Sequence, residues 1–586
     1  MTRPKEEAKE TSPLSDKPHG INRLFRQLVP YGFCIEAKKQ LGLVIPVFLS
    51  RMMGLLVIIV SSIFCGHLGK IELDSVTLAS SIINIICVSI GSGMSAGCDT
   101  LMSQTYGSKN LKRVGTILQR GILILMLCCF PCWAMLINTE EVLLLCKQNP
   151  DVARLTQKYV MIFLPGLPAV FLHQLQFRYL QNQGIIWPQV FTGIAVNLIN
   201  VVVNAIFMYV FKMGVEGSAW ANTFSQWIMS LSLFLYIVGK KVYVETWGGW
   251  SKDCLQEWDI FLRLAIPSTL MLCIEWWSFE IGSFLAGLIS VVELGTQAIM
   301  LELVTLAAML PYGFGTAANI RVGTALGAGD IKQAKMSCKV VLYCAAFGSL
   351  VVSSIALALK NVIGYMFTTD GDIIALLSKI MLLFPPLHMC EGINTACGGI
   401  LRGTGRQKIG AITNIFGYYL IGIPVGLSLM FLTKLGVIGL WIGIFCPLLL
   451  QTCIYIPYIF CMNWHKVCEE ARIRAGLKPV NVPDPRTSQT DVLKSDYGLM
   501  DNGGTTMSDS GFGAIAMHDV SSGEDHTKQL ELKEDLPMET TNVVGEILST
   551  KQLIVRRGLA LLLSISVLLI GITIKLLLPK GNAGAN

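Results

Sequence analysis

Long apolar segments separated by short polar loops run through most of the chain. Two sets of six follow one another, and each segment is long enough to cross a bilayer as a helix. The first set spans about 41–65, 76–101, 114–137, 157–179, 187–210 and 217–239. The second set spans about 259–286, 292–317, 337–358, 374–398, 409–432 and 437–460. A last apolar segment, Gly558–Leu578, follows Arg556 and Arg557 and brings the expected number of spans to thirteen.

Polar stretches divide this pattern into five regions. Residues 1–40 are basic, lack the apolar core of a signal peptide, and form an N-terminal segment. Residues 41–240 and 241–465 hold the two sets of six helices. Residues 466–555 are rich in Ser, Thr, Asp, Glu and Gly, and we expect a flexible linker because such a segment cannot bury enough apolar surface to order itself. Residues 556–586 hold a thirteenth transmembrane helix and a short tail.

Basic residues gather in alternate loops. They follow the even-numbered predicted spans, whereas the other loops are acidic or nearly neutral. Because loops rich in Lys and Arg stay in the cytoplasm, we expect a cytoplasmic N-terminus and linker and an extracellular C-terminal tail. The basic clusters are Lys109, Lys112 and Arg113; Arg178; Lys240 and Lys241; Arg321, Lys332 and Lys335; and Arg402, Arg406 and Lys408.

The composition supports a polytopic membrane protein. Hydrophobic residues make up 53% of the chain and charged residues only 15%. The net charge of +7 sits in loops and in the N-terminal segment, so it requires no nucleic-acid partner. Most of the 18 cysteines lie in apolar segments, where we interpret them as small apolar residues. We expect no metal site, no cofactor and no enzymatic activity.

The two sets of six helices are internal repeats. At one nearly constant shift along the chain, Ile45-Pro46 falls on Ile266-Pro267, and Glu72-Leu73 falls on Glu293-Leu294. Near the end of each half, Lys212 likewise falls on Lys434 and Gly214 on Gly436. Each half starts on the same side of the membrane, so the repeats are parallel. This plan is known among transporters, which place the substrate site near the membrane midplane and alternate access by rocking the lobes.

Four glutamates lie inside apolar segments of the second lobe. They are Glu275, Glu280, Glu302 and Glu391. A charged group at bilayer depth costs at least about 2.5–3.5 kcal/mol, so it marks a substrate or proton pathway by default. The repeat positions in the first lobe hold Gly54, Ile59, Ile82 and Phe171, so the fold alone does not require the acids.

Carboxylates at this depth can exchange protons for cations. Burial and neighbouring acids favour the protonated form, and a cation then competes with the proton. The faces of Trp276 and Trp277 can bind an organic cation, and Asn84 is a further candidate contact. More ordinary roles stay open: a buried glutamate can pair with a hydroxyl, a tryptophan can face lipid, and Asn84 can join helices by hydrogen bonds.

Three segments resemble the multidrug and toxin extrusion (MATE) transporters. They are Ile266-Pro267 with Glu275-Trp276-Trp277, the turn Arg321–Gly327, and the turn Leu401–Gln407. The resemblance covers about residues 30–465, and the linker and last span resemble the vertebrate branch. It implies two six-helix bundles around a V-shaped cleft, and a proton-coupled exporter of organic cations in the plasma membrane, on apical faces of epithelia. It also implies that Glu275, Glu280, Glu302 and Glu391 occupy the family's functional acidic positions. We expect Glu275 to exchange protons and substrate, Glu302 and Glu391 to tune it and contact cations, and Glu280 to be structural or to support the other acids. Many bacterial members carry an aspartate on the first helix, and the first span here has no acid.

Other functions remain as alternatives. Some relatives couple to sodium, and related families with the same helix plan flip lipid-linked saccharides, although that would favour a basic cavity. A receptor or scaffold acting through the linker is a third alternative. An enzyme is the least favoured class, because no nucleophile–base or metal constellation stands out.

Overall fold

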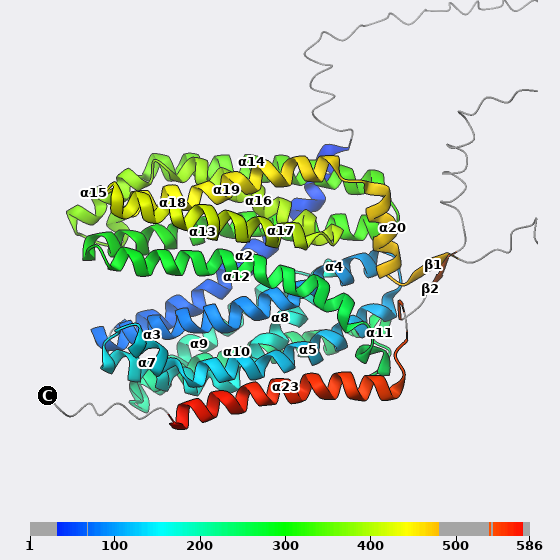
Figure 1. Cartoon of the computed structure of the whole chain (residues 1–586), viewed down its shortest axis with the longest axis horizontal. Coiled ribbons are helices and arrows are strands. Elements are labelled where there is room, and N and C mark those ends of the chain that lie inside the picture. The colour runs from blue at the N-terminus through cyan, green and yellow to red at the C-terminus, as the bar shows by residue number, and fades with distance from the viewer. Residues whose placement is uncertain (1–31, 67, 480–537, 541–542, 546, 578–586) are drawn as a thin grey trace, which may run out of the picture.

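The computed structural model describes residues 32–66, 68–479, 538–540, 543–545 and 547–577. Within these residues, twelve helical segments, the C-terminal one included, are long and apolar enough to cross a membrane. A bent pair of helices, Gly371–Ile380 and Phe384–Thr404, provides one more span and brings the total to thirteen. The predicted fold class is therefore confirmed: two helical bundles and an additional C-terminal helix. In Figure 1 the helices run side by side, with the second lobe above the first and α23 along the lower edge.

The first lobe contains six spans, some of them built from consecutive helical elements, and the short helix α6. The elements are α2 (Phe33–Gly66), α3 (Lys70–Ile83) continued by η1 (Asn84–Val88) and α4 (Ser89–Gly107), α5 (Leu111–Ile137), α6 (Thr139–Leu145), α7 (Pro150–Phe163) with η2 (Leu164–Gly166) and α8 (Leu167–Asn182), α9 (Trp187–Ala205) with η3 (Ile206–Val210), and α10 (Gly214–Gly239). A connection containing α11 (Tyr243–Thr246) and η4 (Lys252–Leu255) leads to the second lobe.

The second lobe repeats this order. It consists of α12 (Trp258–Gly287), α13 (Val291–Gly327), α14 (Ile331–Leu359), η5 (Ile363–Met366), α15 (Gly371–Ile380), α16 (Phe384–Thr404), α17 (Gln407–Asn414), η6 (Ile415–Gly422), α18 (Ile423–Leu427), η7 (Ser428–Leu432) and α19 (Val437–Cys461). The backbone repeats in detail, since Lys212 and Lys434 share a positive φ of 54° and 57°, and so do Gly214 and Gly436 at 57° and 58°. The tenth predicted span is broken: α15 and α16 meet at an angle of 56°, and Pro385 and Pro386 lie in the first turn of α16, where proline cannot continue a preceding helix.

The first helix of each lobe begins against the other lobe. Val44 of α2 belongs to the second-lobe core, and the Glu36 carboxylate accepts hydrogen bonds from Arg321 at 2.6 and 2.9 Å. Conversely, Phe261 and Leu264 of α12 are buried in the first-lobe core. The predicted boundary near residue 240 therefore separates the sequence repeats but not the packed cores.

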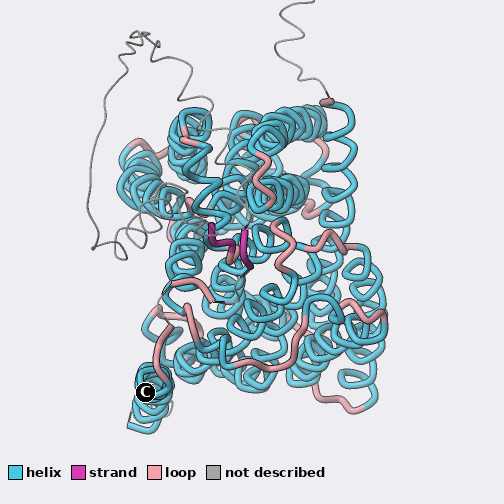
Figure 2. The backbone as a smooth tube through the Cα atoms, turned by 90° about the vertical axis from the view of Figure 1, so that its right-hand side faces the viewer, coloured by secondary structure: helices cyan, strands magenta, loops and turns pink. Residues whose placement is uncertain are grey.

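The lobes meet closely near α20 (Trp464–Arg474). An added Cβ at Gly327 would stand 1.9 Å from the carbonyl oxygen of Gln104, and one at Gly107 would stand 2.1 Å from that of Thr324. Only glycine permits this approach. Arg474 bridges the junction, donating to the Gln104 side chain at 3.1 Å and to the Thr404 carbonyl at 3.1 Å. The structure is thus closed between the lobes at this end, which faces the viewer in Figure 2.

The polar segment 466–555 is ordered at both ends. Trp464, Val467, Cys468 and Ala471 recur at helical spacing and are buried, so the start of the segment forms α20 instead of a flexible chain. Next, β1 (Leu477–Pro479) pairs antiparallel with β2 (Met538–Thr540). The remaining part of the expected linker, 480–537, lies outside the described residues.

The thirteenth helix packs on the first lobe. α23 (Thr550–Leu577) begins before the predicted apolar span and runs along α5. Asn138 donates to the Gly571 carbonyl at 3.0 Å, and Lys575 pairs with Glu141 at 2.6 Å. At the other end, the Arg557 guanidinium lies 4.2 Å from the centre of the Trp258 ring.

Candidate functional site

Two of the four predicted glutamates line one cavity in the second lobe. Glu275 of α12 and Glu391 of α16 face a partly open space of about 550 Å³ between helices α12, α13, α16, α17 and α19. We call this space the acidic cavity. Its other polar side chains are Ser268, Tyr312, Asn394, Thr395, Arg402, Asn414, Gln451 and Tyr455.

Glu391 owes its position to the bend before α16. A new helix starts there with the proline pair in its first turn, and His388 lies three residues before the glutamate, on the same face. The His388 Nδ1 atom lies 3.3 Å from the Glu391 Oε2 atom. His388 is fully buried and its ring stacks on Phe384 with centroids 5.3 Å apart. Glu391 is thus held by a fixed imidazole.

Glu275 has a different environment. Within the described residues, no donor lies within hydrogen-bond distance of its carboxylate and no ion pair includes it. Other polar side chains of the cavity already have hydrogen-bond partners. Asn414 donates to the Met271 carbonyl at 2.8 Å, and Gln451 and Tyr455 both donate to the Asn414 Oδ1 atom at 3.1 Å. Arg402 lines the same cavity and lies within electrostatic range of Glu275. A carboxylate without a hydrogen-bond partner is costly to ionise in an apolar environment.

The other two glutamates lie outside the acidic cavity. Glu280 is half-buried one and a half turns further along α12, and Glu302 is exposed on α13. Neither belongs to the cavity lining. The sequence therefore indicated all four acids, but the structure brings only Glu275 and Glu391 together.

The predicted substrate contacts are spread over both lobes. Trp276 lies beside the Tyr312 hydroxyl and so close to the acidic cavity. Trp277 points elsewhere: it is exposed, and its indole donates to the Ile85 carbonyl of the first lobe at 3.3 Å. Asn84 begins the π-helical turn η1 and is half-buried. Only Trp276 is placed to contact a ligand beside Glu275.

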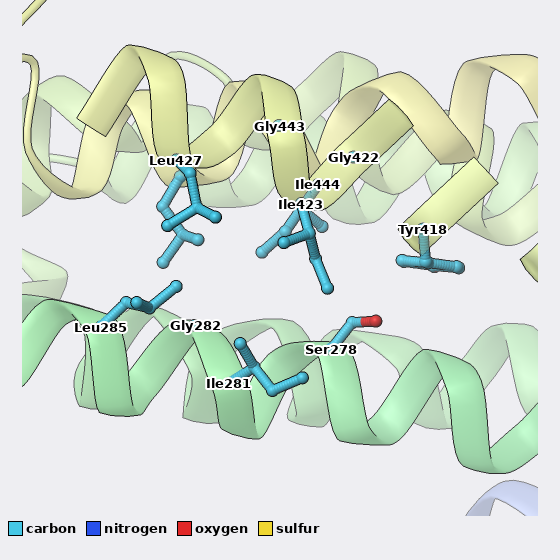
Figure 3. Close-up of a pocket in the computed structure, with 11 residues that line it drawn as sticks. Ser278, Ile281, Gly282, Leu285, Tyr418, Gly422, Ile423, Leu427, Gly443 and Ile444 are labelled. Atoms are coloured by element: carbon cyan, nitrogen blue, oxygen red, sulfur yellow. The ribbon is translucent and has the colours of Figure 1, made fainter. Parts of the chain in front are cut away.

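A second, apolar pocket adjoins this region. It is a partly open space of about 320 Å³ between α12 and the α18–α19 pair, and Ser278 and Tyr418 lie near each other at one end (Figure 3). Tyr418 is also within electrostatic range of Glu275 and Glu391, so this end of the pocket lies toward the acidic cavity. The two spaces together offer an acidic and an apolar compartment.

Several buried charges near the site escaped the sequence analysis. Arg178 was assigned to a loop, but it lies in α8 and binds Asp99 of α4 at 2.6 Å. Arg402 was likewise assigned to a loop, but it lies in α16 and lines the acidic cavity. Arg51 lies in the middle of the first span and was overlooked. All three could have been found in the sequence as charged residues inside, or at the edge of, an apolar segment.

Comparisons with known proteins identify the family. A sequence model described as MatE matches residues 46–206 and again 267–427, so it repeats with the internal repeat. The chain is 52% identical to multidrug and toxin extrusion protein 2 of Mus musculus over 546 residues, covering 93% of each. It is 48% identical to multidrug and toxin extrusion protein 1 of Homo sapiens over 540 residues, covering 92% of this chain and 93% of that one.

The fold agrees with these relatives. The crystal structure of the eukaryotic MATE transporter AtDTX14 superposes with a TM-score of 0.73 at 29% identity and covers 76% of this chain and 100% of that one. A Vibrio cholerae MATE transporter, VcmN in its bent form, superposes at 0.64 with 15% identity, which supports the fold alone. Family model, full-length relatives and fold agree, and the chain belongs to the multidrug and toxin extrusion family of membrane transporters.

Proposed function

We propose that the protein exports organic cations in exchange for protons, and that Glu275 and Glu391 carry the exchange. The observation that supports this most directly is the carboxylate of Glu275, which has no partner among the described residues and faces the same cavity as Glu391. Such a carboxylate is more stable with a bound proton or a bound cation than in the ionised form without a partner. Competition for one carboxylate is sufficient to couple the two flows in opposite directions.

The surroundings suit an organic cation better than a hydrated metal ion. Tyr312 lines the cavity and Trp276 lies beside it, and aromatic faces stabilise a desolvated ammonium by about 2 kcal/mol. The neighbouring pocket adds an apolar surface beside this site. Glu280, Glu302, Trp277 and Asn84 lie outside this arrangement, and we assign them no direct part in the exchange step.

The junction at α20 closes one end of the space between the lobes, so access to the acidic cavity would be from the opposite end. We assign the α20 end to the cytoplasm, in keeping with the basic loops, and the C-terminal tail to the outside of the plasma membrane, on the apical face in epithelia. Rocking of the lobes would then open and close the junction, alternating access to the cavity. A gradient of one pH unit supplies about 1.4 kcal/mol per proton, which concentrates a singly charged cation about tenfold.

The test is uptake of labelled tetraethylammonium into vesicles that contain the purified protein and are acidic inside. Parent protein should accumulate the cation only while the pH gradient lasts, with or without sodium. Glu275→Gln should abolish the gradient-driven uptake, because an amide cannot hold a proton or balance a cation. Glu216→Gln, on a side chain that is 45% exposed and paired with Lys158 at 3.3 Å, is the matched control and should transport normally.

Three results would overturn the proposal or part of it. Full pH-driven uptake by Glu275→Gln at a normal amount of inserted protein would remove Glu275 from the exchange. A strict requirement for a sodium gradient would change the coupling ion. No uptake under either gradient would reject cation exchange and favour a lipid-linked saccharide flippase.

A further inference from the structure

The chain between α20 and α23 joins the two lobes at the closed end of their junction. α20 follows the second lobe, and its Val467, Cys468 and Ala471 belong to the core of that lobe. β1 comes directly after α20 and pairs with β2, and the chain then leads into α23, which packs on α5 of the first lobe. In Figure 1, β1 and β2 lie next to α20, and α23 begins below them. We call β2 and the described residues between it and α23 the strap.

The strap is attached to the first lobe through the residues just before α12. The Gln256 side chain donates to the Leu548 carbonyl, and the Leu548 N–H donates to the Gln256 Oε1 atom, each at 3.0 Å. The Val544 N–H donates to the Glu257 carboxylate. Glu257 itself is held at 2.9 Å by two arginines of α5. This end of the strap is therefore fixed, and α23 continues from it along the same lobe.

The attachment of the strap to the second lobe is much smaller. It is the antiparallel ladder between residues 477–479 and 538–540. Hydrogen-bonded and non-bonded pairs alternate in such a ladder, and Pro479 has no N–H to donate. Few hydrogen bonds can therefore join the two strands, and the ladder is the attachment that separates most easily.

α20 and the first lobe meet beside this ladder. Asn110, at the start of α5, donates to the Ala475 carbonyl at 3.2 Å, and Arg113 donates to the Arg474 carbonyl at 3.0 Å. Arg113 also binds Glu257, to which the strap is attached. The end of α20 and the strap thus share one anchor on the first lobe. If α20 moves away from α5 while the strap stays on the first lobe, the ladder has to break.

We propose that the strap is a latch: its pairing with β1 holds the α20 end of the junction closed, and β1 and β2 separate each time that end opens. The inference goes beyond the proposed function, because it depends on neither the solute nor the coupling ion. It requires only that the lobes part at α20 during the cycle. Transport would then be slowed by whatever strengthens the pairing of β1 with β2.

The first experiment locks the latch. Lys478 and Glu539 are partners in the ladder, and the Cα atoms of such partners lie about 4.5–5.5 Å apart, within the range that a disulfide spans. The double variant Lys478→Cys with Glu539→Cys also receives a protease site within 480–537. It is oxidised with diamide, which takes up the two thiol hydrogens, and is later reduced with dithiothreitol. After cleavage, a non-reducing denaturing gel shows whether the two fragments are joined. Lys478→Cys alone and Glu539→Cys alone, treated in the same way, are the matched controls.

The second experiment weakens the latch. Because bonded and non-bonded pairs alternate, Glu539→Pro combined with Thr540→Pro removes a ladder donor whichever of the two residues is bonded. The readout is alkylation of a cysteine introduced by Ser103→Cys, at a fully buried position that faces Gly323 across the junction. Two prolines placed within the linker, Ser521→Pro with Ser522→Pro, are the matched control.

We expect opposite effects from the two changes. The oxidised double-cysteine variant should lose tetraethylammonium turnover in the acid-loaded vesicles and regain it on reduction, whereas both single-cysteine controls should keep it. The proline pair in β2 should raise the alkylation rate of the introduced thiol by about twofold to tenfold, the range of one hydrogen bond. The proline pair in the linker should leave that rate unchanged.

The outcomes separate the latch from the proposed function. Normal turnover by cross-linked protein would overturn the latch and leave cation exchange intact. Failure of the disulfide to form would show that β1 and β2 do not pair, and would overturn it as well. If the parent protein does not transport tetraethylammonium, the proposed function fails and alkylation decides: faster reaction with the β2 proline pair supports the latch, and an unchanged rate overturns it.

Discussion

Gly327 is the position at which one methyl group should stop the transport cycle. It ends α13 at the α20 end of the lobe junction, and its repeat counterpart Gly107 ends α4. In Gly327→Ala the new Cβ would stand 1.9 Å from the carbonyl oxygen of Gln104, where ordinary contact begins at 3.4 Å. The obstacle is backbone, so it cannot rotate away, and the helices would have to separate by the difference between these two distances.

The size of the effect follows from this overlap. Overpacking a close contact costs roughly 1–3 kcal/mol. The cost applies to the closed junction and not to an open one, so it shifts the balance between the two states by roughly 5–150-fold. An alternating-access transporter needs both states, and we expect the turnover rate to fall by at least about fivefold on that scale.

Two measurements on Gly327→Ala test this reasoning. The first is the turnover of tetraethylammonium in acid-loaded vesicles, normalised to the amount of inserted protein. The second is alkylation of a cysteine introduced by Ser103→Cys, at a fully buried position facing Gly323 of the other lobe, with the modified site identified by mass spectrometry. Compared with Ser103→Cys alone, the combined variant should turn over slowly and its introduced thiol should react faster.

Gly558→Ala is the matched control, because an added Cβ there meets nothing within 4 Å. It should behave as the parent protein in both measurements. Parental turnover of Gly327→Ala together with unchanged protection of the introduced cysteine would refute the reasoning, since the contact would then tolerate the methyl group.

Two further predictions concern stability and assembly. Glu257 is buried and faces both Arg113 and Arg120 at 2.9 Å. Glu257→Gln removes the carboxylate that these two buried cations share, so the free energy of unfolding should fall by about 3–5 kcal/mol and the Tm of the purified protein should be lower. An unchanged Tm would contradict the assignment. Gly571 lets α23 approach α5, because an added Cβ would stand 2.8 Å from the Ala134 Cβ atom. We would introduce a protease site within 480–537 and cleave the purified protein there. The C-terminal fragment should stay bound in the parent protein and dissociate in Gly571→Leu. Retention of the fragment in both proteins would show that this contact does not hold α23.

The architecture was accessible from the sequence because a membrane restricts the choices. Length and hydropathy locate spans when every backbone polar group must be satisfied within the helix. The repeat was equally readable, since Lys212 and Lys434 mark the same tight turn in both lobes. What the hydropathy pattern could not show was the exchange of helix starts between the lobes, because Val44 and Phe261 are equally apolar whichever core they enter.

The site was only partly accessible for a related reason. Glu275 and Glu391 stand out as charges in apolar segments, but so does Glu302, and only the packing separates the cavity-lining acids from the exposed one. Arg402 was misplaced because the glycines of α16 near it resemble a turn. They serve close packing instead, as an added Cβ at Gly399 would meet the Gly315 carbonyl oxygen at 2.0 Å.

The lobe junction shows how an internal repeat can build a switch. Gly107 meets Thr324 and Gly327 meets Gln104, and the same shift along the sequence relates the two glycines and the two partners. The contact is therefore self-complementary about a local twofold axis, as in a symmetric dimer. The charges break this symmetry: Glu275 falls on Gly54 of the first lobe, while Asp99 falls on Asn319 of the second. The glycine contacts can close the junction without a ligand, because they involve only the two lobes. The charges occur in one lobe only at each repeat position, so a charged ligand would interact with them unequally. We therefore expect a ligand bound at the acidic cavity to shift the junction between its closed and open arrangements.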